Sequence, residues 1–246
     1  HMRLHRLGHV VHHAGFQAGG AVFLEHVGGH RHDGRAGVAG QGVDHVVCTG
    51  DVTNLGLSSE FAFARACFDR IALGPSHVTC IPGNHDAYVA EIGGGFEKVF
   101  DPYCTADDEW RWPAGGRWPV VRVRGDLAVI GLSTSQPTPW LMAYGSLGHE
   151  QLDRLERVLA DPRLARRCRV VLMHHPPVGP SARSVIRGLR DHAALARVLA
   201  RHGAELVLHG HDHVEARETL AGPAGAVVAV HGIPPCTYAG PRTRSG

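Results

Sequence analysis

The sequence predicts an α/β fold in which a sandwich of β-sheets is covered by helices. Two observations carry this prediction. From about residue 43, short runs of apolar and β-branched residues alternate with segments that place apolar residues at helical spacing. The chain has 246 residues, of which 43% are hydrophobic, and this suits one globular domain with a sizeable core.

The first half of this pattern predicts three strands and one helix. The segment "LSSEFAFARACFDRI" predicts a helix with Ser58 or Ser59 as its N-cap. The strands are predicted in "DHVVCTGD", "HVTCIPGNHD" and "LAVIGLST". Between the second and third strands, residues 97–119 hold three tryptophans with several Pro and Gly. Two interpretations stay open for this segment: a cap over one edge of a site, or an ordinary surface loop with aromatics tucked under it.

The second half predicts two helices and three strands. "LGHEQLDRLERVLA" is an amphipathic helix, and "DHAALARVLARHG" is a helix closed by Gly203. The strands are predicted in "RVVLMHHPP", "AELVLHGHDH" and "GAVVAVHG". This alternation of strands and helices is typical of an α/β sheet covered by helices.

The composition argues against several classes of function. With 25 basic and 23 acidic residues the formal net charge is +2, which gives no electrostatic case for a nucleic-acid binder. No apolar run approaches the length of a membrane span, and no signal-peptide pattern is present. The cysteines form no C-x-x-C pair, so Cys48 and Cys80 are expected as small buried hydrophobes. We expect a reduced, cytoplasmic protein.

The first 42 residues break the pattern. They contain ten glycines and eight histidines but no Ser, Thr, Pro or Lys. We therefore divide the chain into an atypical Gly/His-rich segment over residues 1–42 and a domain over residues 43–246. The irregular tail "PPCTYAGPRTRSG" leaves open whether the closing strands of that domain are present.

Metal-ligating side chains follow four of the predicted strands. They are Asp51, then Asn84-His85-Asp86, then His174-His175, and last His211-Asp212-His213. Because sites in α/β sheets form where strands end and loops begin, we expect these side chains to converge. Each motif alone could be a turn, but the ordered set of four favours a site.

The order of these motifs resembles the calcineurin-like metallophosphoesterase superfamily. That family's pattern runs Asp-x-His, Gly-Asp, Gly-Asn-His-Asp/Glu, His and Gly-His-x-His, and four of the five motifs stand here between about residues 43 and 232. The resemblance implies a four-layer α/β/β/α sandwich of the metallo-dependent phosphatase type. It also makes residues 43–246 a metallophosphoesterase domain.

The resemblance implies a set of metal ligands. Asp51 would bridge two ions, and His213 would bind the second of them. Asn84, His174 and His211 would complete the shell of the first ion. Independently of the family, such mixed nitrogen and oxygen donors suit Mn, Fe, Zn or Co.

The resemblance also implies a reaction. A small phosphodiester or phosphomonoester would be hydrolysed by attack of metal-bound hydroxide, and two ions would clamp the phosphoryl group. His85 would contact the phosphate and protonate the leaving oxygen, and Asp86 would orient His85. Arg183, Arg187 and Arg190 follow the fourth strand, and they form either a phosphate contact or a solvated helix face.

The family's first motif, Asp-x-His, is missing upstream of Asp51. Three explanations stay open: His9, His12 or His13 supply replacement ligands, the site holds one ion instead of two, or residues 3–42 are an out-of-frame translation. The alternative function is accordingly a catalytically impaired, mononuclear or metal-free relative that acts as a binding or scaffold protein.

Overall fold

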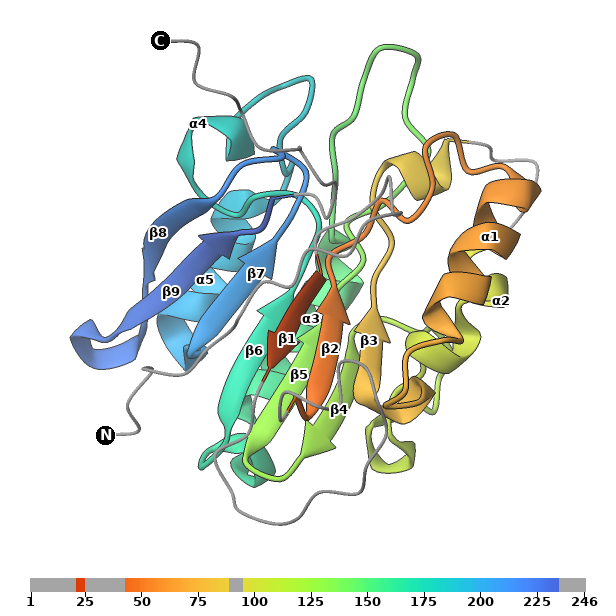
Figure 1. The fold of residues 1–246 in the computed structure, drawn as a ribbon. Helices are drawn as coiled ribbons and strands as arrows, with labels where there is room; N and C mark the ends of the chain where they lie inside the picture. The colour runs from red at the N-terminus through yellow and green to blue at the C-terminus, as the bar shows by residue number, and fades with distance from the viewer. Residues whose placement is uncertain (1–20, 25–42, 89–94, 235–246) are drawn as a thin grey trace, which may run out of the picture.

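The computed structural model describes residues 21–24, 43–88 and 95–234, and in these ranges the chain forms two β-sheets (Figure 1). The smaller sheet has the order β1-β2-β3, with β1 antiparallel to β2 and β2 parallel to β3. Its strands are β1 (Ala21–Leu24), β2 (His45–Cys48) and β3 (Val78–Cys80).

The larger sheet has the order β4-β5-β6-β7-β9-β8. Its four inner strands are parallel, and the edge strands β4 and β8 are antiparallel to their neighbours. Its strands are β4 (Val120–Arg124), β5 (Leu127–Gly131), β6 (Cys168–Leu172), β7 (Leu206–His209), β8 (Ala216–Ala221) and β9 (Val227–Gly232). The helices are α1 (Ser58–Phe68), α2 (Gly95–Val99), α3 (Gly148–Ala160), α4 (Gly179–Ala182) and α5 (His192–His202).

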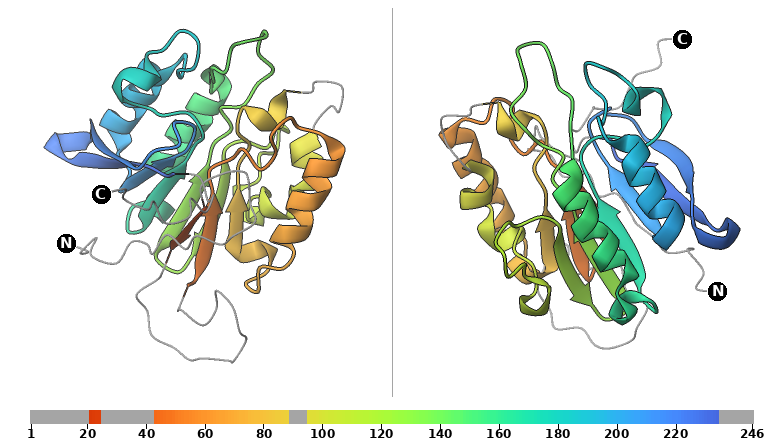
Figure 2. Two further views of the ribbon diagram at one scale, coloured as in Figure 1. Left: turned by 45° about the horizontal axis from the view of Figure 1, so that its top comes forward. Right: turned by 180° about the vertical axis from the view of Figure 1, so that it is seen from behind.

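The elements stack in four layers, with the two sheets inside and helices on both outer faces (Figure 2). Between the sheets, Val47 of β2 packs in one cluster with Val129 of β5 and Val170 of β6. The neighbours of Val47 in β2, Val46 and Cys48, belong instead to the cluster under α1 and α2. Because side chains alternate across a strand, both faces of each sheet are buried, and the predicted α/β sandwich is confirmed.

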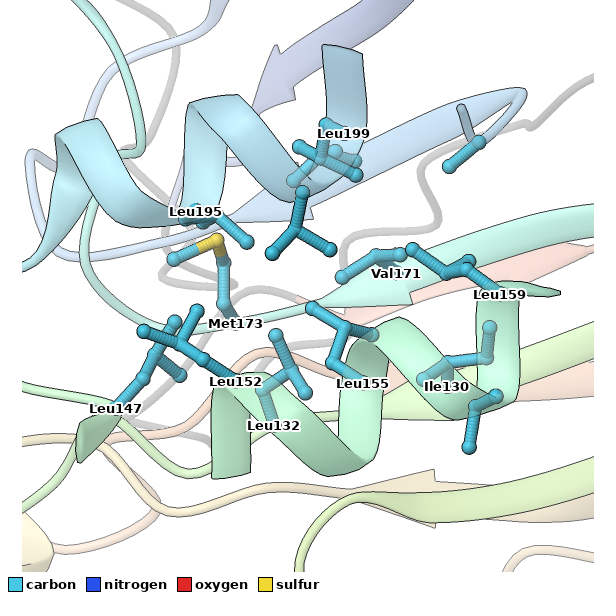
Figure 3. Packing of buried hydrophobic residues seen from close by; sticks show 14 of the residues in the cluster. Ile130, Leu132, Leu147, Leu152, Leu155, Leu159, Val171, Met173, Leu195 and Leu199 are labelled. Carbon is cyan, nitrogen blue, oxygen red and sulfur yellow. The ribbon is translucent and has the colours of Figure 1, made fainter. Parts of the chain in front are cut away.

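The largest core lies between the outer face of the larger sheet and helices α3 and α5 (Figure 3). Leu155 of α3 and Leu199 of α5 pack with Val171 of β6 and with Met173 directly after it. The helical spacing of leucines in both helices supplies this apolar face. The core holds β6 firmly up to the point where His174 leaves the strand.

All six predicted strands and three predicted helices are present, with one correction at a helix start. Ser58 is already the first residue of α1, and Leu57 occupies the N-cap position. The Glu60 carboxylate accepts hydrogen bonds from the backbone N–H groups of Asn54, Leu55 and Leu57. A glutamate in the first turn, and not a serine cap, therefore ties the loop before α1 to the start of the helix.

Trp110 and Trp112 anchor the tryptophan-containing segment to the core. Trp110 is buried in the cluster beneath α3, with the Arg163 guanidinium 4.0 Å over its ring. Trp112 Nε1 donates to the Pro119 carbonyl oxygen at 2.9 Å. These contacts favour the ordinary-loop interpretation. Cys48 and Cys80 are buried, as predicted.

Candidate functional site

Four predicted ligands converge where strands of both sheets end (Figure 1). Asp51 and Asn84 follow β2 and β3 of the smaller sheet, and His174 and His211 follow β6 and β7 of the larger sheet. Asn84 Oδ1 lies 2.9 Å from His174 Nε2 and 2.9 Å from His211 Nδ1. Asp51 Oδ2 lies 3.3 Å from His174 Nε2. All four side chains are buried.

Backbone strain brings these groups together. Asp51 and His211 have φ values of 58° and 69°, in a region that non-glycine residues rarely occupy. Gly83 is required beside Asp51, because a Cβ at residue 83 would stand 2.1 Å from Asp51 Oδ1. Gly50 has φ 99°, and a Cβ there would stand 2.5 Å from the Gly83 nitrogen. The loops after β2 and β3 are therefore packed backbone against backbone.

Hydrogen bonds outside the cluster orient two of the ligands. His174 Nδ1 donates to the Thr49 carbonyl oxygen at 2.8 Å, so its Nε2 faces Asn84 and Asp51. Asn84 Nδ2 donates to the Tyr88 hydroxyl at 2.7 Å, so Oδ1 faces the histidines. Metal-binding histidines are commonly oriented in this way, by a carbonyl on the second ring nitrogen. Sequence reasoning missed Tyr88, although it stands four residues after Asn84.

The charges within the cluster are coupled. Burial alone would raise the pKa of Asp51, but the neighbouring His174 and His85 hold it well below its usual range. Burial opposes a charge on His174, yet the Asp51 carboxylate raises the pKa of His174. Burial and the charge of His174 lower the pKa of His211 to about 3. The cluster thus favours a positive charge on His174 beside the Asp51 carboxylate.

The donor atoms fit a divalent ion. In a shell of metal–ligand bonds near 2.1 Å, adjacent ligand atoms stand about 3 Å apart, which is close to the spacing within this cluster. Two imidazoles, one carboxylate and one amide oxygen are a mixed set that suits Mn, Fe, Zn or Co. Among the described residues, no three His, Cys, Asp or Glu side chains by themselves make a ready metal site. The convergence here centres on the amide oxygen of Asn84.

His85 stands beside the cluster. Its backbone N–H donates to Asp51 Oδ1 at 3.0 Å, and its Nδ1 donates to the Asn54 carbonyl oxygen at 2.7 Å. The Tyr88 ring packs against it, with ring centroids 4.7 Å apart. These contacts leave Nε2 as the ring nitrogen that Asn54 does not engage.

The Asp86 carboxylate, which was predicted to orient His85, makes its hydrogen bonds to other groups. Its carboxylate accepts hydrogen bonds from the backbone N–H groups of Val52, Thr53 and Gly83 and from the Thr53 hydroxyl. Burial, assisted by the Asp51 charge, raises the pKa of Asp86 to about 6. The contacts of Asp86 tie together the loops after β2 and β3, whereas the ring of His85 is held by Asn54.

His213 is not part of the convergence. It is exposed, with φ 58°, and the four clustered ligands make no hydrogen bond to it. The candidate replacements His9, His12 and His13 lie outside the described residues. The structure therefore assembles the predicted ligands of one ion, and those of a second ion stay a prediction.

His175 has a structural role next to the cluster. Its Nδ1 lies 2.7 Å from Thr134 Oγ1, and its Nε2 donates to the Ala143 carbonyl oxygen at 2.9 Å. Burial lowers the pKa of His175 well below its usual range, so it is neutral. Of the paired histidines, only His174 presents a ring nitrogen to Asn84 and Asp51.

A family model described as calcineurin-like phosphoesterase matches residues 12–215. The chain belongs to the calcineurin-like phosphoesterase family. A cAMP/cGMP dual specificity phosphodiesterase of Mycobacterium tuberculosis is 30% identical to this calcineurin-like phosphoesterase over 183 residues. The match covers 73% of this chain and 51% of that protein, so the chain spans about half the length of the curated relative.

Solved structures show a weaker likeness to this family member. A purple acid phosphatase from yellow lupin (Lupinus luteus) has a TM-score of 0.47 and 17% identity, and the match covers 77% of this chain and 37% of that one. A dimetal phosphatase from Danio rerio has a TM-score of 0.40 and 13% identity, and covers 73% and 78%. The family assignment rests on the sequence match and not on these likenesses. In the described part of the chain, no helix is long and apolar enough to span a membrane.

Proposed function

We propose that the chain is a metal-dependent phosphoesterase that hydrolyses a phosphodiester or phosphomonoester. The observation that carries the proposal is the convergence of Asp51, Asn84, His174 and His211 on a common point, with His85 alongside. A divalent ion bound there supplies Lewis-acid activation of the phosphate and of the attacking water. The residues proposed to hold it are these four, and His213 is proposed for a second ion.

The side chains around the cluster have proposed roles of their own. His85 protonates the leaving oxygen through Nε2, because Nδ1 is committed to the Asn54 carbonyl, which also stabilises the protonated ring. Asn84 contributes a neutral oxygen, which limits the negative charge that an anionic substrate meets. Arg187 is proposed to contact the phosphate, because its positive charge acts to lower the pKa of both His211 and Tyr88.

For the substrate we propose a phosphodiester, with cyclic nucleotides as the first class to test. The support is the relative from Mycobacterium tuberculosis, which is named a cAMP/cGMP phosphodiesterase. Because this chain covers only about half of that protein, the substrate has to be measured directly.

The test is hydrolysis of bis(p-nitrophenyl) phosphate, p-nitrophenyl phosphate and cAMP with added Mn²⁺. Wild type is compared with His85→Ala and Asp51→Asn, and His149→Ala, an exposed histidine on α3, is the matched control. Activity that falls at least about 100-fold in the two site variants and not in the control supports the proposal. Equally slow hydrolysis by all four proteins contradicts the proposal.

Elemental analysis separates the proposal from its alternative. Two ions per chain support a binuclear enzyme, and one ion supports a mononuclear site at the four clustered ligands. A metal-free protein that stays inactive after incubation with Mn²⁺ supports the binding or scaffold alternative.

A further inference from the structure

Four large apolar side chains project into solvent from two neighbouring loops. They are Trp140, Leu141, Val185 and Ile186, with exposed fractions of 92%, 80%, 68% and 52%. We call this set the apolar tip. Exposed apolar residues scattered singly are ordinary, but a cluster with a nearly fully exposed tryptophan indicates an interaction site.

The two loops are joined to each other. The Ala143 N–H donates to the Ile186 carbonyl oxygen at 2.9 Å, and the Gly145 N–H donates to the Gly188 carbonyl oxygen at 3.0 Å. The Arg190 N–H closes the pairing on the Gly145 carbonyl oxygen at 2.9 Å. Val185 and Ile186 are thereby held beside the loop that carries Trp140 and Leu141.

The conformation of the first loop is specified by its own contacts. Thr138 Oγ1 donates to the Met142 carbonyl oxygen at 2.6 Å, and the Met142 N–H donates to Pro139. Leu141 has φ 67°, a strained value for a leucine. At the base of the loop, His175 bonds both Thr134 and Ala143. These contacts hold the loop in place, and Leu141 combines a strained backbone conformation with an exposed side chain.

The charged residues within the two loops have one sign. Residues 133–147 and 176–190 contain no Asp or Glu, and the second range contains Arg183, Arg187 and Arg190. All three arginines are exposed. Glu218 lies beside Gly179, at the start of the second loop, and the Asp191 carboxylate is taken by Ser146 and the backbone N–H groups of residues 147 and 148.

We propose that the apolar tip docks on the surface of an anionic lipid bilayer. Indole and aliphatic side chains would enter the interfacial layer, and Arg183 and Arg190 would face the anionic headgroups. Charge complementarity and the projecting shape of the apolar tip favour a lipid bilayer as its partner. The apolar groups project into solvent, and the charged side chains of the same two loops are all basic, as in interfacial anchors. Both loops rise beyond the strand ends where the four ligands converge (Figure 1), so docking turns that end of the molecule toward the membrane.

The test is sedimentation of the protein with vesicles, in chelator and without substrate, so that the result is independent of any activity. Vesicles of phosphatidylcholine are compared with vesicles that also contain phosphatidylglycerol. We expect binding to the anionic vesicles, and a loss on the order of tenfold or more in Trp140→Ala/Leu141→Ala. Arg183→Ala weakens binding about fivefold, and added salt weakens the wild type.

The matched control is Phe63→Ala/Val227→Ala, which removes exposed apolar side chains from α1 and β9 and leaves binding unchanged. The chain has four tryptophans, so quenching by brominated lipid that is lost in Trp140→Ala locates the tip in the bilayer. The proposal is overturned if wild type binds neither vesicle, or if the tip variant binds as well as wild type. Dimerisation in sedimentation velocity that the tip variant abolishes, without vesicle binding, would assign the tip to a second copy of the chain and also overturn it.

Discussion

Replacing Asp86 tests whether its negative charge or its hydrogen bonds matter more. Its carboxylate accepts from three backbone N–H groups and the Thr53 hydroxyl, and its pKa rises from an ordinary 3.8 to about 6. Keeping the carboxylate ionised at neutral pH therefore costs about 3 kcal/mol relative to the unfolded chain. Asp86→Ala recovers that cost but leaves three N–H groups unpaired, at about 2 kcal/mol each. We expect a net loss of about 3 kcal/mol in the free energy of unfolding.

Asp86→Asn separates the two effects. An amide oxygen placed toward Val52 and Gly83 keeps two hydrogen bonds, and the Thr53 hydroxyl turns to accept from the new NH₂ group, so one N–H is left unpaired. Its cost of about 2 kcal/mol is offset by the recovered ionisation cost, and we expect stability within about 1 kcal/mol of wild type. In wild type the pKa of Asp86 is higher in the folded state than in the unfolded chain. Asp86 therefore stabilises the fold below pH 3.8, and this contribution is lost as the pH rises through about 6.

The assay is urea unfolding of the metal-free proteins at pH 7, repeated at pH 4 for wild type and Asp86→Asn. The difference between these two proteins should change by about 2 kcal/mol across that interval, because pH 4 is still slightly above the unfolded-state pKa of 3.8. If Asp86→Asn is as unstable as Asp86→Ala, the reasoning is refuted, because the negative charge of Asp86 would then stabilise the folded state. Activity gives a second readout: since Asn54 holds His85, Asp86→Asn should leave the pH dependence of kcat/KM unshifted, whereas an orienting role would shift it.

Three further predictions concern the cluster and the core. Tyr88→Phe removes the acceptor of the Asn84 amide, so Mn²⁺ affinity in isothermal titration calorimetry should fall about tenfold; unchanged affinity would contradict the orienting role. A proton on His174 competes with the ion for the same ring nitrogen. Mn²⁺ affinity should therefore fall about tenfold per pH unit below the raised pKa of His174 and level off above it. An affinity that does not change with pH would exclude His174 as a ligand. Arg122 of β4 donates hydrogen bonds to four backbone carbonyl oxygens. Arg122→Met should therefore lower the free energy of unfolding, measured in urea, by about 3 kcal/mol or more without changing kcat. A variant as stable as wild type would contradict this structural role.

The sequence predicted the four clustered ligands because the signal for each is local. Each follows an apolar run that forms a strand, and parallel strands bring their carboxyl ends together. The same reasoning failed for β4, because the buried Arg122 interrupts its apolar pattern. It also missed β8, whose alternation of half-buried and exposed residues is weakly apolar.

Contacts between distant residues were not predictable. Two of the three residues that bond the Asp86 carboxylate, Val52 and Thr53, lie 34 and 33 residues away, across the packed backbones of Gly50 and Gly83, and no local pattern indicates that arrangement. His213 has the residue type and spacing of a ligand, but a backbone turn at φ 58° leaves it exposed. The residue types state what chemistry is possible, and the path of the chain decides which side chains meet.

The division of donors between the two sheets has a consequence for folding. The smaller sheet supplies only oxygens, from Asp51 and Asn84, and the larger sheet supplies only nitrogens, from His174 and His211. Neither sheet alone holds a full ligand set, so affinity for an ion arises only when the two halves of the sandwich have docked. An ion that binds there cross-links the halves and stabilises their association by mass action. During refolding, the moment of ion uptake would thus report when the two sheets dock.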